Sequence, residues 1–155
     1  MSFQIHALPM SSFKPLFALS ETDLALRNVR RVVADGRPVY PCRVSLQDAK
    51  EGEELLLLPY AHHVVDTPYR ASGPIYVRQA AEQVLPARDE VPQLLRSRVL
   101  SLRAYDRSGM MVWAEVLPGD EVEQGIERLF AIAGTDYIHL HYAKPGCYAC
   151  RVDRG

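Results

Sequence analysis

The stretch YIHLHYAKPGCYACRVD, residues 137–153, shows the fold most clearly because it reads as one complete hairpin. Two runs typical of strands, 137–143 and 147–153, flank Lys144-Pro145-Gly146, which suits a three-residue loop. Apolar and aromatic residues then face each other on one side, in the pairs Tyr142–Tyr148, Leu140–Cys150 and Ile138–Val152. A shift of one residue would mix the two faces, so the pattern favours this register.

The opposite face of this hairpin carries two histidines, His139 and His141. On a strand they lie about 6.5–7 Å apart on the same face, a spacing that two ligands of one zinc ion can use. A third ligand has to come from elsewhere in the chain, from His62, His63 or Asp66. A mononuclear zinc or iron site is therefore a third hypothesis, behind two that need no cofactor.

Working outward, residues 99–117 predict a second hairpin with the loop Asp106-Arg107-Ser108-Gly109. An amphipathic helix is expected at about 120–133, with Asp120 as N-cap and Gly134 as C-terminal stop. A shorter helix is expected at about 20–29. Further strand-like runs are 30–34, 42–46, 55–60 and 75–78. Hairpins without regular strand–helix alternation predict an α+β fold with a largely antiparallel sheet, in a single domain over 1–155.

The bulk composition excludes several classes of protein. The formal net charge is -1 and the basic residues are scattered, which argues against a nucleic-acid partner. The longest strongly apolar run, residues 55–58, ends at Pro59 and is far too short to span a membrane. Three cysteines, without a recognisable export signal at the N-terminus, predict free thiols in a reducing compartment. We therefore expect a cytoplasmic protein that does not enter the membrane.

The segment 59–78, PYAHHVVDTPYRASGPIYVR, contains the largest group of polar residues to which the strand and turn patterns assign no role. Arg70, Ser72 and the backbone amides around Gly73 are expected in a loop that can bind an anion. His62 or His63 would be the acid–base group near neutral pH and are the candidate catalytic residues. The leading hypothesis is a small-molecule or anion-binding protein, and whether it is an enzyme stays open. The same hypothesis adds four further ligand-binding candidates, namely Arg43, His139, His141 and Arg151.

The second hypothesis is an interaction or structural domain that binds no small ligand. Trp113 and Met111 lie on the face of the predicted strand opposite Val112 and Ala114. Exposed apolar side chains there would favour a partner surface or a homodimer.

The sequence Cys147-Tyr148-Ala149-Cys150 has the C-x-x-C spacing of zinc knuckles and redox sites. The predicted hairpin places the two sulfurs on opposite faces of a strand, and nothing after Cys150 is helical enough to lower a thiol pKa. Both cysteines are interpreted as structural, Cys150 in the core and Cys147 beside the turn.

Three stretches carry a resemblance to a known family: YPCRVSLQDAKEGEELLLLPY (40–60), PYRASGPIYVR (68–78) and GCYACRVDR (146–154). On these the chain resembles a family of small bacterial proteins that is catalogued only as a domain of unknown function. The resemblance covers essentially the whole chain and implies a bacterial, cytoplasmic, single-domain protein. It implies no activity, substrate or catalytic residue.

Overall fold

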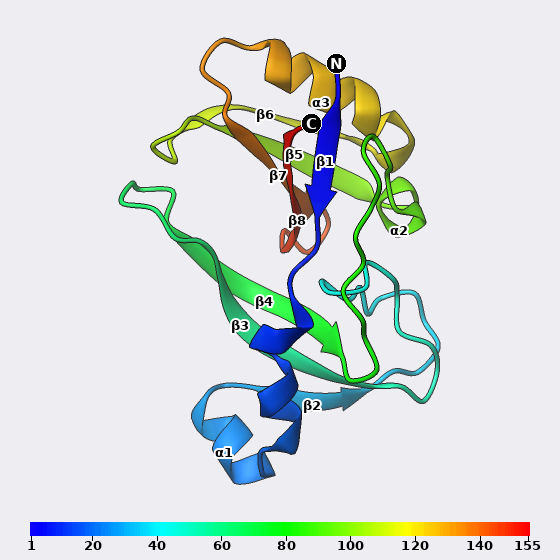
Figure 1. Cartoon of the computed structure of the whole chain (residues 1–155). Coiled ribbons are helices and arrows are strands. Elements are labelled where there is room, and N and C mark those ends of the chain that lie inside the picture. Colours follow the sequence, from blue (N-terminus) through cyan, green and yellow to red (C-terminus); the bar gives the residue numbers. More distant parts are fainter. The chain divides into compact units, whose positions relative to one another are not determined.

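The computed structural model describes residues 1–155, and the fold is α+β, as the sequence predicts (Figure 1). The strands are β1 (Phe3–His6), β2 (Arg30–Val33), β3 (Glu54–His63), β4 (Ala71–Arg78), β5 (Val99–Tyr105), β6 (Met111–Pro118), β7 (Tyr137–Tyr142) and β8 (Tyr148–Arg154). The α-helices are α1 (Glu21–Leu26), α2 (Gln93–Arg96) and α3 (Val122–Ala131), with short 3-10 helices η1 (Met10–Ser12), η2 (Lys14–Ala18) and η3 (Gly119–Glu121). Both predicted hairpins and both predicted helices are confirmed, with shorter helices than expected.

The chain folds into two compact units that alternate along the sequence. The first unit comprises Met1–His6, Ala61–Gly73 and Leu85–Gly155, and the second comprises Ala7–Tyr60 and Pro74–Val84. The single domain expected over 1–155 stays a prediction. No helix is long and apolar enough to cross a membrane.

An antiparallel five-stranded sheet forms the first unit, in the order β1-β8-β7-β5-β6. Helix α3 covers one face of this sheet with the apolar side predicted from its 3.6-residue period (Figure 1). Gly125 makes the close approach possible, because a Cβ there would lie 2.5 Å from Leu117 Cδ2 and 2.7 Å from Leu102 Cδ2. The face covered by α3 is therefore the core of this unit, and the opposite face of β7 carries the histidines.

The start of α3 differs from the prediction. The 3-10 helix η3 precedes it, so Asp120 lies inside that turn and is not the N-cap, and the N-cap position of α3 is Glu121. Gly119 N donates to Arg98 O at 2.7 Å, and a Cβ at Gly119 would lie 1.9 Å from Leu95 O, so this entry requires glycine. At the other end Gly134 has φ +94°, as the predicted stop requires.

The β7–β8 hairpin contains an irregularity that the sequence pattern does not reveal. Leu140 pairs with Cys150 and Ile138 with Val152, as expected, but His141 pairs with Tyr148. One extra residue in β8 forms a β-bulge, which shifts every position on the turn side by one. The predicted pair Tyr142–Tyr148 is therefore wrong, and Tyr148 joins the histidine face.

The second unit contains β2 and most of the three-stranded sheet β2-β3-β4. Its apolar cluster includes Leu24 of α1 and Leu56 of β3, both fully buried. Residues 42–46 are a turn and not the predicted strand, with Leu46 N donating to Cys42 O at 3.0 Å. Cys42 forms an isolated bridge with Tyr76, and burial of the apolar side chains in this turn explains their hydrophobic pattern.

Strand β4 begins at Ala71, four residues earlier than the predicted start at Ile75. Ser72 and Gly73, expected in a turn, are therefore in extended backbone. Pro74 is tolerated because β4 is an edge strand, where a missing N–H costs no ladder hydrogen bond.

Candidate metal centre

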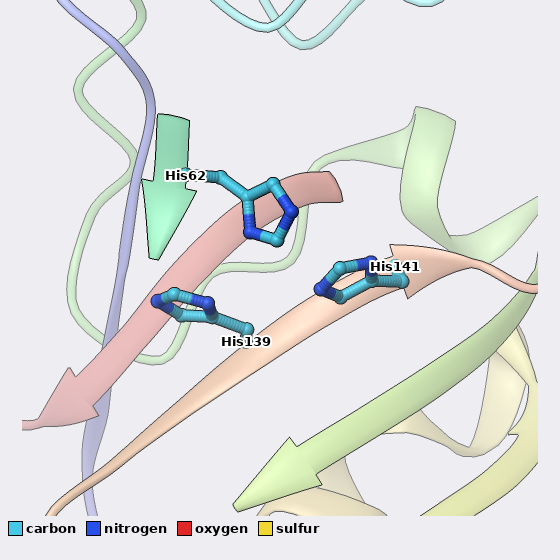
Figure 2. A group of neighbouring side chains, drawn as sticks. All are labelled: His62, His139 and His141. Carbon is cyan, nitrogen blue, oxygen red and sulfur yellow. The ribbon is translucent and has the colours of Figure 1, made fainter. Parts of the chain in front are cut away.

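Three histidines converge in the first unit: His62 near the end of β3, and His139 and His141 on β7. One ring nitrogen from each lies within 4.8 Å of those of the other two. Figure 2 shows the three imidazole rings turned toward a common space. His139 and His141 are 3% and 1% exposed, while His62 is half-buried. The cluster is therefore enclosed by the sheet on one side and more open beside His62.

Strand geometry explains why the two β7 histidines share this space. His139 and His141 are two positions apart, so both project from the face of β7 opposite α3. On neighbouring β5, Arg103 lies opposite His139 and Ser101 opposite His141. The period-2 pattern that placed the histidines together in the sequence is confirmed by this register.

Hydrogen bonds define which nitrogens are available. His141 Nδ1 lies 3.0 Å from Gly146 O, and a carbonyl only accepts, so Nδ1 carries the proton and Nε2 carries the lone pair. The Nδ1 atoms of His62 and His139 are buried and have no hydrogen-bond partner. Leaving a buried polar atom without a partner lowers the stability of the fold by about 1–3 kcal/mol. These two nitrogens are therefore candidates to bind a ligand.

Burial holds His62 and His139 in their neutral form. Burial lowers the pKa of His139 to about 2, and the neighbouring His63 adds to the effect. Burial likewise lowers the pKa of His62 to about 4, with contributions from the charges of His63 and Arg103. A neutral imidazole presents a lone pair, which is the form that binds a metal ion.

Tyr148 forms a wall of the cluster. Its ring is stacked on His62, with centroids 5.3 Å apart and 6° between the planes. It also meets His139 edge-on at 5.1 Å and His141 at 5.9 Å. The β-bulge brings Tyr148 to this face, and regular pairing would have turned it into the core.

His63 is excluded from the ligand set because both of its ring nitrogens are engaged. Its Nδ1 lies 2.8 Å from Tyr69 O and therefore donates. Its Nε2 lies 2.5 Å from the Tyr137 hydroxyl, which donates to it. Its ring packs against Tyr105 with centroids 4.1 Å apart and lies 5.1 Å from His139. His63 thus supports the β7 face rather than offering a lone pair.

Only some of the predicted ligand-binding residues of the first unit lie at this cluster. Arg151 lies there, because it is paired with His139 across β7 and β8. Arg70 is exposed and lies 3.8 Å from Asp66 at the surface. Ser72 is exposed, and a Cβ at Gly73 would lie 4.0 Å from His62 Nε2, so the Gly73 backbone borders the cluster.

Arg43 and Trp113 are also singled out by the sequence, for ligand binding and for a partner surface. Arg43 belongs to the second unit, is 1% exposed, and donates from Nη1 to Pro41 O at 2.5 Å. Trp113 is 59% exposed on the edge strand β6, as the interaction hypothesis requires. The roles proposed for both stay predictions.

Sequence reasoning missed two residues of the site, Tyr148 and Arg103. The sequence pattern places Tyr148 on the apolar face, because a two-residue period does not reveal a bulge. Arg103 lies within the predicted hairpin at 99–117, where the sequence gives it no role of its own. Ser101, Arg103 and Tyr105 alternate with apolar residues in the sequence, which indicates that they share one face of a strand. Pairing with β7 shows that this is the face of the histidines.

The chain belongs to a family described as a protein of unknown function (DUF1203), whose model matches residues 39–154. The expected resemblance to a family of unknown function is confirmed. The matched region includes all three histidines of the cluster. Comparison with curated proteins and with solved structures gave no match.

Proposed function

We propose that this protein binds one divalent transition-metal ion through His62, His139 and His141. The observation that carries the proposal is the convergence of one ring nitrogen from each of three histidines within 4.8 Å. In the same cluster the Nδ1 atoms of His62 and His139 are buried and have no hydrogen-bond partner. In an ordinary core, buried histidines have both nitrogens satisfied, as His63 does here. A metal ion held by the three histidines would bind such nitrogens through their lone pairs.

The surroundings of the ligands fit a metal centre. Metal-binding histidines usually donate their second ring nitrogen to a carbonyl or a carboxylate, which fixes the ring and its tautomer. His141 has this arrangement through Gly146 O. Tetrahedral zinc with Zn–N bonds of about 2.0–2.1 Å needs nitrogens roughly 3.4 Å apart, so metal binding draws the rings together by about an ångström or a little more.

The donor set suits zinc among other transition metals and leaves one coordination position for chemistry. Imidazole suits zinc, iron, copper and nickel, and a site with three protein ligands keeps a fourth position for water or substrate. A zinc ion in such a site lowers the pKa of its bound water to about 7 and makes it a nucleophile near neutral pH. The proposed activity is therefore metal-assisted hydration or hydrolysis, reached from the side of the half-buried His62.

Equilibrium dialysis against zinc, with elemental analysis of the protein, tests the proposal. We expect one zinc per chain for the natural sequence. His62→Ala, His139→Ala and His141→Ala should each weaken binding by about a hundredfold or more, because changes to groups that merely orient ligands already cost 10–100-fold. His6→Ala is the matched control, since His6 lies on β1 and is bound to Asp153 outside the cluster.

The design separates loss of a ligand from loss of the fold. Circular dichroism establishes that each variant is folded, and His139→Phe retains a planar ring in the buried position if His139→Ala does not fold. Zinc bound substoichiometrically by the natural chain, or equally well by the His139 variants, would contradict the proposal.

We further propose a cytoplasmic location. Its support is the state of the three cysteines, all free, with Cys42 and Cys150 buried. Free thiols are the usual state in a reducing compartment.

A further inference from the structure

The proposed metal centre has an unbalanced positive charge. Its ligands are three neutral imidazoles, and the cluster contains no aspartate or glutamate. A divalent ion bound there therefore retains its full charge, in contrast to sites with carboxylate ligands. A partly enclosed site with this charge attracts an anion to the open coordination position.

Arg103 adds to this charge from the neighbouring strand. It lies opposite His139 in the β5–β7 register, on the same face, where directly paired residues have Cβ atoms about 4.5–5.5 Å apart. Its side chain therefore leaves the sheet on the face that carries His139 and His141. The side chain is partly buried, so its field is less screened than that of a surface arginine.

No carboxylate neutralises Arg103. Its hydrogen-bond partners are the hydroxyls of Ser101, at 3.3 Å from Nε, and of Tyr105. Arg151, the corresponding residue on the other side of His139, is bound to Asp153 at 2.8–3.1 Å and packs over the Tyr137 ring. Of these two flanking arginines, Arg103 is the one with charge available for a ligand.

We propose that the site takes a small ligand with an anionic oxygen group, one oxygen on the metal ion and the group held by Arg103. This inference rests on the proposed metal-binding function and names the class of ligand for it. A guanidinium binds the planar pair of oxygens of a carboxylate, or two oxygens of a phosphate, through two parallel hydrogen bonds. Ser101 and Tyr105 orient Arg103 for this contact without using its charge.

Cobalt(II) in place of zinc makes the proposal measurable, because the visible spectrum of the ion changes when a ligand enters its coordination sphere. The cobalt-loaded protein is titrated with acetate, with inorganic phosphate and with neutral acetamide. We expect acetate, phosphate or both to shift the spectrum saturably, and acetamide to leave it unchanged. The comparison of the two anions distinguishes a carboxylate ligand from a phosphate ligand.

Variants then assign the anion contact to Arg103. Arg103→Gln should weaken anion binding by about tenfold or more while cobalt still binds, and Arg103→Lys should fall between Gln and the natural residue. Arg107→Gln, in the exposed β5–β6 loop, is the matched control and should bind anions normally.

The outcomes separate the two proposals. If cobalt binds but neither anion changes its spectrum, or if Arg103→Gln binds anions as well as the natural chain does, the anion inference is overturned and the metal-binding function stands. If cobalt itself does not bind, the proposed function fails and this inference fails with it. If both Arg103 variants are misfolded, the titrations of the natural chain still test whether an anion binds at the metal ion.

Discussion

The chemistry of the candidate site comes from histidines kept neutral inside a protein. The unfolded chain has imidazoles with pKa near 6.5, whereas the folded chain holds His139 at about 2 and His62 at about 4. Below pH 6.5 the unfolded state therefore binds more protons than the folded state. Stability from these residues is complete above pH 6.5 and is lost as the pH falls toward the folded pKa values.

We predict that the metal-free protein unfolds more easily in mild acid. Between pH 7.5 and pH 5.5 the free energy of unfolding should fall by roughly 2–3 kcal/mol, about half from each of His62 and His139. Urea unfolding at several pH values measures this change. His139→Phe should remove about half of the pH dependence, and a midpoint that is constant or higher at pH 5.5 would contradict the assignment.

Some of the site's residues could be predicted from the sequence and some could not. The pairing of His139 with His141 on one face follows from the two-residue period of a strand, which local sequence determines. The position of His62 beside these two histidines depends on contacts between segments about eighty residues apart, which no local pattern encodes. The sequence therefore named His62 only among several candidate third ligands.

At the scale of elements, a bulge and a loop shape the site. The extra residue in β8 turns Tyr148 onto the histidine face, where regular pairing would have buried it on the other side. The β5–β6 loop meets the segment that follows the β3 histidines, since Thr67 Oγ1 donates to Gly109 O at 3.0 Å. The sequence predicts a turn at this loop from its residue types, but it does not predict the contact of the loop with residues 65–67.

Gly109 provides a test of that contact. It has φ +92°, and a Cβ there would lie 2.5 Å from Val65 Cγ1. We predict that Gly109→Ala destabilises the protein by about 1–2 kcal/mol for the left-handed backbone and roughly 1–3 kcal/mol more for displacing Val65. Chemical denaturation measures both contributions together.

Gly134→Ala is the matched control for this prediction. Gly134 has φ +94° but nothing within 4 Å of its Cβ position, so it reports the backbone cost alone. The difference between the two variants is the cost of the Val65 contact. Equal losses of stability would show that the loop does not support the segment after β3.

At the scale of the whole molecule, the two units are interleaved in sequence, yet one of them holds the complete candidate site. All three proposed ligands, Tyr148 and Arg103 belong to the first unit. The α+β class and both hairpins followed from alternation and turn residues. The division into two units did not, because the chain contains no linker-like composition at the crossings near residues 6, 60, 73 and 84.

X-ray absorption at the zinc edge tests the central claim most directly, because it identifies the atoms bound to the metal ion. We predict three imidazole nitrogens at about 2.0–2.1 Å and one further oxygen, with no sulfur. The His139→Phe variant should lose one imidazole contribution if it retains zinc at all. Sulfur scattering at about 2.3 Å, which would assign the metal to the cysteines, or the absence of imidazole scattering would contradict the account.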